Sequence, residues 1–188
     1  RKLTASLDPR AIQESLYTYV QELITCNTFG VGMVDWERRL IRFEYVIEND
    51  KMVEPYSRSL DAKEQPAAQC VNFASELLIN SLSVDTREFD SVLRIGRDED
   101  ECLHQDARDF AMPRSAIYVP MMLQERVIGV VSVQSEYANA FHENDLVVLR
   151  SLGAYAAVAF DNADSYSRLR QAQNKLVEQE KLAALGAV

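Results

Sequence analysis

From His142 to residue 188 the sequence has no proline and only two glycines, Gly153 and Gly186. Proline and glycine are the residues that most disfavour a helix interior, so the segment is predicted to form one continuous α-helix. At about 1.5 Å per residue this helix would be roughly 60 Å long or more, which exceeds the diameter of a small domain. We therefore expect its distal part to project from the domain that precedes it.

Apolar residues recur along this predicted helix at helical spacing. Its first half carries a stripe that steps by three and four residues, formed by Leu149, Leu152, Ala156, Ala159, Ala163 and Tyr166. The stripe then continues at intervals of seven, through Leu169, Leu176 and Ala183. A projecting helix with a heptad stripe favours pairing with another helix, so we expect two copies of the chain to associate. The predicted homodimer interface comprises Leu149, Leu152, Ala156, Phe160, Ala163, Leu169 and Leu176.

The composition favours one compact domain with extensions. The chain has 188 residues, of which 47% are hydrophobic, and this suffices to bury a core without disulfides or metals. Its formal net charge is −9, and such a surface repels phosphate backbones and anionic lipid headgroups. No apolar run approaches the roughly 20 residues that span a bilayer. We expect neither nucleic acid nor a direct membrane contact.

The three cysteines, Cys26, Cys70 and Cys102, have no CxxC spacing. This pattern disfavours a disulfide framework or a structural zinc site, and it fits a reducing, cytoplasmic compartment. The chain has no signal-peptide pattern and begins with arginine, so we expect a piece of a longer protein whose remainder could be anchored in a membrane.

The N-terminal region is expected to form a helix and then a hairpin. The helix is predicted to start at Pro9, with Asp8 as its N-cap, and to end near Asn27. Apolar and other residues then alternate over 29–34 and 41–48 on either side of a polar turn. Alternation of period two predicts a half-buried antiparallel hairpin.

The middle of the chain is expected to form a loop, a helix and a second hairpin. Residues 49–64 are polar and contain a proline, which favours a loop, whereas 65–80 return to helical spacing. Residues 81–114 have no clear period. Two nearly continuous apolar runs, 116–123 and 127–133, predict a hairpin whose strands are buried on both faces.

The first of these two strands contains Pro120, which lacks the N–H that a sheet requires, so we expect a bulge or an unpaired edge there. The complete order is helix, hairpin, helix, loop, hairpin and long helix. This order predicts an α+β fold, in which an antiparallel β-sheet has helices packed on one face and a long projecting C-terminal helix.

In this order, three segments resemble the GAF domain family. The hairpin strands at 115–121 (SAIYVPM) and 126–133 (RVIGVVSV) resemble the core strands of that family, and 141–146 (FHENDL) resembles the start of its last helix. The opening of the chain, 7–31, is also similar. The resemblance implies a GAF-like sensor domain over 8–165, with 1–7 as the end of an upstream linker.

The segment 176–186 (LVEQEKLAALG) resembles the linker that leads into the dimerisation helix of a bacterial histidine kinase. The resemblance implies that 166–188 are a signalling helix and coiled-coil linker to an output domain in the same chain. It further implies a non-catalytic regulatory domain in a two-component system. A diguanylate cyclase output and a dimerisation module that binds no ligand are the alternatives.

The resemblance also implies where a small-molecule pocket would lie, between the sheet and the middle helix. Cys70, Phe73, Tyr118 and Ser132 would border that cavity, and ordinary core packing is the alternative for each of them. The ligand itself is unknown. His142 replaces the Ser or Thr that typically caps the last helix of the family, so Asp145 or water is expected to take over the capping.

Other candidate chemistry is disfavoured. Cys102 and His104 resemble a bilin attachment site, but they are not adjacent and the rest of that signature is missing. The acidic cluster within 98–106 lacks calcium-loop spacing, so no metal site is expected. Phe141 and Asp145 match part of a cyclic-nucleotide set, and both also suit an ordinary helix start. No nucleophile has a base in a known catalytic frame, so we expect neither an enzyme nor a bilin, haem or nucleotide cofactor.

Overall fold

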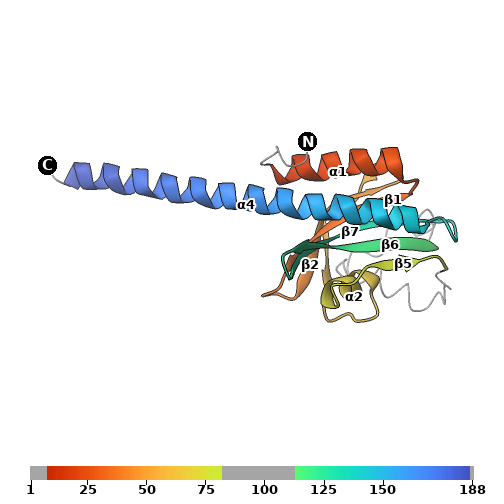
Figure 1. Ribbon diagram of the computed structural model, residues 1–188. Coiled ribbons are helices and arrows are strands. Elements are labelled where there is room, and N and C mark those ends of the chain that lie inside the picture. Colours follow the sequence, from red (N-terminus) through yellow and green to blue (C-terminus); the bar gives the residue numbers. More distant parts are fainter. Residues whose placement is uncertain (1–7, 82–112, 187–188) are drawn as a thin grey trace, which may run out of the picture.

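The computed structural model describes residues 8–81 and 113–186. An antiparallel sheet lies between helices, with α1 and α4 on one face and α2 on the other, and α4 extends far beyond the sheet (Figure 1). The predicted α+β fold with a long C-terminal helix is confirmed. The elements are α1 (Pro9–Leu23), β1 (Thr28–Asp35), β2 (Leu40–Glu48), β3 (Lys51–Met52), β4 (Tyr56–Ser59), α2 (Pro66–Asn72), β5 (Leu77–Ile79), β6 (Ser115–Leu123), β7 (Arg126–Ser135) and α4 (Glu143–Gly186).

The sheet has the strand order β3-β2-β1-β7-β6-β5, and β4 also pairs with β2. The two predicted hairpins, β1–β2 and β6–β7, form its centre, because β1 pairs with β7. Each face of the sheet has its own apolar core. One core joins the sheet to α1 and α4, and the other joins it to α2. Helices therefore cover both faces, where the sequence led us to expect one.

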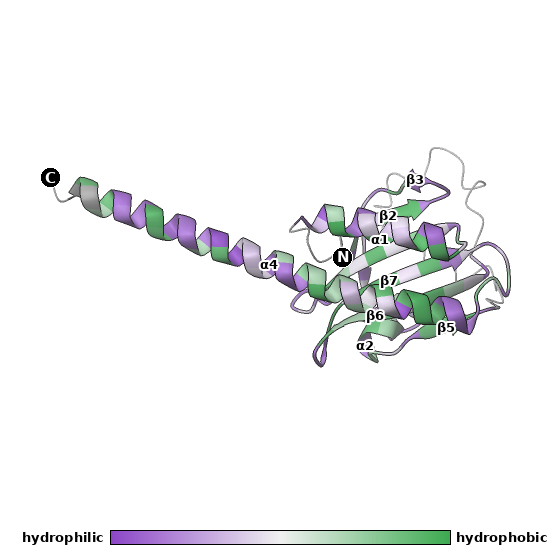
Figure 2. Cartoon of the chain, turned by 45° about the horizontal axis from the view of Figure 1, so that its top comes forward, coloured by the Kyte–Doolittle hydropathy of each residue, from purple (hydrophilic) through white to green (hydrophobic). Residues whose placement is uncertain are grey.

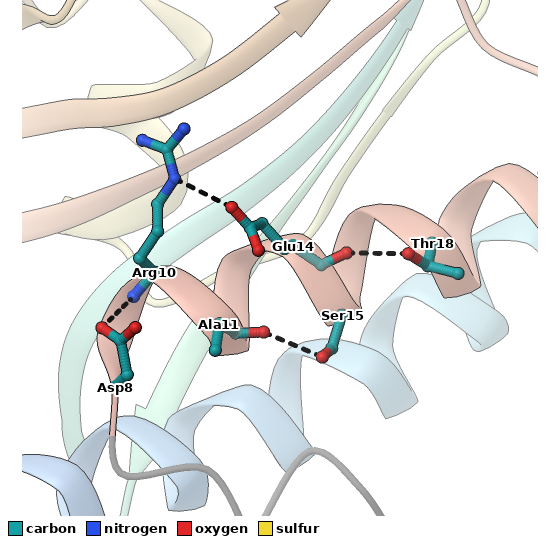
Figure 3. A network of polar contacts seen from close by, with 6 residues as sticks. All are labelled: Asp8, Arg10, Ala11, Glu14, Ser15 and Thr18. Atoms are coloured by element: carbon teal, nitrogen blue, oxygen red, sulfur yellow. Dashed lines mark hydrogen bonds and ion pairs between the residues drawn. The ribbon is translucent and has the colours of Figure 1, made fainter.

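Helix α1 starts where the sequence predicts. The Asp8 carboxylate accepts a hydrogen bond from the Arg10 N–H at 3.1 Å, as an N-cap does, and Figure 3 shows this contact beside the Arg10–Glu14 ion pair. The helix ends at Leu23, four residues before the predicted end. The reason lies in the sheet, since the Asn27 N–H already donates to the carbonyl of Gln134 in β7.

Two predictions for the middle of the chain are wrong. Residues 49–64 contain two short strands, β3 and β4, both paired with β2. The helix expected over 65–80 ends at Asn72, after which Ala74 adopts a left-handed φ of 47° and β5 pairs with β6. A short apolar run such as 77–79 satisfies both helix and strand patterns, and pairing with β6 decides in favour of the strand.

Pro120 is accommodated as expected. The pairing of β5 with β6 ends at Leu77 and Tyr118, and Pro120 lies beyond that pair. No residue of β5 therefore requires an N–H from Pro120. On the other side β6 pairs with β7, and the register shifts between Met121 and Met122. A bulge next to a proline lets the hydrogen bonds between the two strands resume past the residue that has no N–H.

Helix α4 begins with one side-chain cap contact and one backbone contact. The Asp145 carboxylate accepts from the His142 N–H at 2.8 Å, and the Asp145 N–H donates to the His142 carbonyl at 3.0 Å. Asp145 thus supplies the third-residue half of a capping box, which satisfies the N–H of His142 and not the first-turn N–H groups that a Ser or Thr cap would satisfy. By length and composition alone, α4 includes a stretch apolar enough to cross a membrane. However, 44% of that stretch is buried inside the fold.

Two glycines differ in how closely other atoms approach them. A Cβ at Gly129 in β7 would overlap the Met121 side chain and lie 2.6 Å from the Gly32 carbonyl oxygen of β1. A Cβ at Gly153 in α4 would lie 3.4 Å from Val119 Cγ1, which is an ordinary contact. The sheet therefore requires glycine at 129, whereas α4 does not require it at 153.

We expect Gly129→Ala to lower the free energy of unfolding by about 1–3 kcal/mol, because backbone and side chain must both move. Gly153→Ala should leave it unchanged or raise it by about 0.5–1 kcal/mol, since alanine favours the helix. Urea titration of the two variants measures both effects. Equal losses in the two proteins would contradict the close approach at Gly129.

Candidate functional site

A row of residues crosses the sheet on the face that α2 covers. Tyr118 in β6 pairs with Ser132 in β7, Ser132 pairs with Gly30 in β1, and Gly30 pairs with Val46 in β2. The centre of the row is small, because a Cβ at Gly30 would lie only 3.1 Å from Ser132 Oγ. Larger side chains flank this low centre, and Ser132 at the centre is buried.

Polar groups of raised pKa line one end of this row. The Tyr118 hydroxyl accepts a hydrogen bond from Gln134 Nε2 at 3.1 Å, and burial raises the pKa of Tyr118. Cys70, on α2, belongs to the same apolar cluster, and burial and then Glu76 raise the pKa of its thiol to about 12. Both groups are therefore protonated at neutral pH, and they can donate hydrogen bonds but cannot act as nucleophilic anions.

Strand β4 adds an aromatic and cationic pair that the sequence did not suggest. Tyr56 stacks on Phe43 of β2 with ring centroids 5.1 Å apart, and the Arg58 guanidinium carbon lies 4.9 Å from the Tyr56 ring centroid. Burial raises the pKa of Tyr56, and Arg58 opposes that shift. The sequence did contain a signal for this strand, because Tyr56 and Arg58 alternate with Ser57 and Ser59. The polar character of 49–64 and its proline led us to predict a loop instead.

The structure brings together three of the four predicted pocket residues. Cys70 and Tyr118 lie in the α2-side cluster, and Ser132 is buried beside Tyr118 in the row. Phe73 is different, because its side chain is 76% exposed just after the end of α2. Its assignment to the pocket border is therefore wrong.

The other candidate residues fall into two groups. Cys102, His104 and the acidic cluster within 98–106 lie outside the described residues. Phe141 is buried in the core on the α4 side and Asp145 caps α4, so both serve the ordinary helix start. Among residues 8–81 and 113–186, no group of three or more His, Cys, Asp or Glu side chains could hold a metal ion.

The predicted dimer interface needs a correction. Five of its seven residues are buried in the core of the same chain, between α4, α1 and the sheet, namely Leu149, Leu152, Ala156, Phe160 and Ala163. A side chain already packed inside its own domain cannot also form a contact between two copies. Leu169 and Leu176, with 57% and 60% of their surface exposed, remain available.

An ion pair links α4 to the segment that follows α2. Arg150 donates to both carboxylate oxygens of Glu76, with Nε–Oε1 at 2.5 Å and Nη2–Oε2 at 2.7 Å. Both residues line an open hollow of about 480 Å³, which Pro120 and Met122 of β6 also line. Since α2 and α4 cover opposite faces of the sheet (Figure 1), this contact connects the two faces around the sheet edge.

A second, smaller hollow of about 300 Å³ lies between the end of α1 and the β2–β3 turn. Its polar network consists of Tyr17, which donates to Asp50 at 3.1 Å, and Gln21, which donates to the Tyr17 hydroxyl at 2.6 Å. Cys26 lines it too, and burial raises the pKa of its thiol to about 11. Tyr17, Gln21 and Asp50 thus bond to one another, which is typical of a structural contact.

Comparison with known proteins identifies relatives of the whole domain. The sequence model described as "GAF domain" matches residues 6–161. No curated protein sequence matches the chain at a significant level.

Solved structures share the fold at low sequence identity. Free methionine-R-sulfoxide reductase from Neisseria meningitidis has 16% identity and a TM-score of 0.63, over 87% of this chain and 84% of that one. The GAF-B domain of DevS from Mycobacterium smegmatis has 15% identity and a TM-score of 0.62, over 86% of this chain and 99% of that one. The GAF domain of an Acinetobacter phosphoenolpyruvate-protein phosphotransferase has 13% identity and a TM-score of 0.62, over 87% of this chain and 89% of that one. At these identities the likeness concerns the fold alone.

The raised pKa values predict unequal cysteine reactivity. At pH 8 we expect Cys70 in the folded protein to react with iodoacetamide roughly a thousandfold more slowly than in denaturant, because its thiolate is scarce. Cys26, whose pKa is about 11, should be slowed less. Mass spectrometry of the alkylated peptides over time measures both rates. Alkylation of folded Cys70 as fast as of Cys26 would contradict this assignment.

Proposed function

The chain belongs to the GAF domain family, and we propose that it is a non-catalytic sensory and regulatory module that dimerises and passes a signal through α4 to an output domain. The output domain would be a histidine kinase in the same chain, in a bacterial two-component system. The module would work in the cytoplasm, on its own or within a membrane-anchored parent protein.

The observation that carries this proposal is the projecting part of α4. Every described side chain from Asp164 onward is exposed, so this part of the helix packs on nothing in its own domain. It nevertheless carries exposed apolar residues at heptad spacing, Leu169 and Leu176, and Figure 2 shows apolar positions among hydrophilic ones along it. A lone helix of this kind is only marginally stable in water, whereas a paired one is stable.

The chemistry of the described cysteines supports a regulatory role over an enzymatic one. The Neisseria structure with a similar fold is described as a sulfoxide reductase in complex with its substrate. Thiol chemistry on a sulfoxide needs an accessible thiolate. Burial holds the thiols of Cys26 and Cys70 in the protonated form, and this makes either a poor nucleophile.

A signal could travel from the α2-side row to α4 through a short series of contacts. A ligand over Gly30 and Ser132 would press on α2, which carries Cys70. The segment after α2 carries Glu76, and Glu76 binds Arg150 of α4. A displacement of α2 would thus reach α4 around the sheet edge. In the alternative, where no ligand binds, the same route would relay strain between an upstream domain and α4.

The kinase output rests on the resemblance of 176–186 to the lead-in of a histidine kinase dimerisation helix. A diguanylate cyclase has a similar lead-in and is the alternative output. In either case the output requires two copies held side by side, and the projecting helix would supply that arrangement. The heptad phase of the projecting helix therefore matters, because a change in that phase rotates the output domain relative to the GAF domain.

Dimerisation can be tested on the chain itself. We expect Leu169→Glu together with Leu176→Glu to convert a dimer to a monomer, because four carboxylates would meet in one apolar seam. Sedimentation equilibrium measures the association state. Val177→Glu together with Leu185→Glu is the matched control, since both residues are exposed on other sides of α4, and it should leave the dimer intact. A monomeric parent chain at high micromolar concentration would refute the proposal.

The output can be tested on the full-length protein with ATP. We expect acid-labile phosphorylation of a histidine downstream of Val188. Seven residues inserted after Gln173 should preserve its regulation because the heptad phase is kept, whereas four residues should change the rate severalfold. Synthesis of a cyclic dinucleotide from GTP without any histidine phosphorylation would establish the alternative output. Equal effects of the two insertions would argue against transmission through α4.

A further inference from the structure

We propose that the dimer seam runs along the outward face of α4, starts within the domain, and is fixed in parallel register by Asn162. The inference rests on the proposed dimer and specifies its geometry. The positions concerned are called the α4 seam below, and they are Tyr155, Val158, Asn162, Ser165, Leu169, Ala172 and Leu176.

The α4 seam is an unbroken heptad pattern. Traced back from Leu176 and Leu169 in steps of seven, it reaches Asn162 and Tyr155, and the positions between them fall at alternating steps of three and four. This spacing keeps one face of a helix toward a partner helix. Within the domain the seam remains open, because Tyr155 is 61% and Val158 is 47% exposed, while their neighbours Ala156 and Ala157 are buried against the sheet.

The occupant that fits this seam is a second copy of the same chain. In a parallel, in-register pair each seam residue meets its own counterpart, so the apolar residues of the seam face apolar residues and its polar residues face polar ones. Asn162 would then face Asn162, and two amides can satisfy each other as donor and acceptor. A shifted or antiparallel pair would place this amide against Val158 or Leu169 and leave it buried without a partner.

Charges beside the seam agree with the parallel arrangement. Lys175 precedes Leu176 on one side of the seam, and Glu180 lies five residues farther on along the other side. In a parallel coiled coil, positions related in this way face each other across the two helices, so Lys175 of one copy would meet Glu180 of the other. Arg168 has a different role, since it pairs with Asp164 of its own helix at 2.8 Å.

Disulfide trapping tests the seam directly. Ser165 lies on the seam and Ser167 lies nearly opposite on the same helix, and both are exposed. In a parallel, in-register pair the two copies of residue 165 come within the Cα separation that a disulfide needs, and the two copies of 167 do not. We expect Ser165→Cys to form covalent dimers under mild oxidation at least tenfold faster than Ser167→Cys. The native cysteines are the same in both proteins and give the common background.

The outcomes separate this inference from the proposed dimer. If the protein sediments as a dimer but the two variants cross-link at equal rates, the seam is elsewhere and the dimer proposal stands. If it sediments as a monomer, both fail. Asn162→Val tests the register, because removing a buried amide should tighten the dimer about tenfold or more and reduce the selectivity for Ser165→Cys. A weaker dimer, or unchanged selectivity, would overturn the role of Asn162.

Discussion

The packing of the first half of α4 on the sheet is the constraint on which the rest of the structure depends. Leu149, Ala156 and Phe160 bury one side of the helix against β6, β7 and α1. This contact fixes the direction in which α4 leaves the domain, and therefore which residues face outward. Burial of such side chains stabilises by about 1.5–3 kcal/mol for a large one, so the inward face cannot be given up cheaply.

Only weak contacts can change at low cost in such a molecule. The Glu76–Arg150 ion pair is half-exposed, and exposed pairs contribute about 0–1 kcal/mol. It can break and re-form without unfolding the domain, whereas the α4 core face cannot. Any event on the α2 side would thus reach α4 through the edge of the sheet, and α4 would respond as one rigid body.

Local patterns in the sequence were sufficient for the elements whose signals are local. The cap at Asp8, the two hairpins and the α4 start depend on neighbouring residues, and all were predictable. Residues 77–79 were not, because strand pairing with β6, distant in sequence, overrides an ambiguous pattern. In the candidate site Tyr118, Ser132 and Cys70 followed from the family resemblance, while Tyr56 and Arg58 depend on pairing between β4 and β2.

The misplaced dimer interface has a geometric cause. Ala163 and Leu169 are six residues apart, which turns an α-helix by about 240° beyond one full turn, so the stripe before Ala163 and the stripe after Leu169 lie on different faces. Counting apolar residues at helical spacing merges the two stripes into one, whereas the structure places the first on a core face and the second on an outward face. One helix therefore serves two partners at once, its own sheet and, on the proposed seam, a second α4. Because the two faces share a backbone, a shift of α4 on the sheet must also shift the seam.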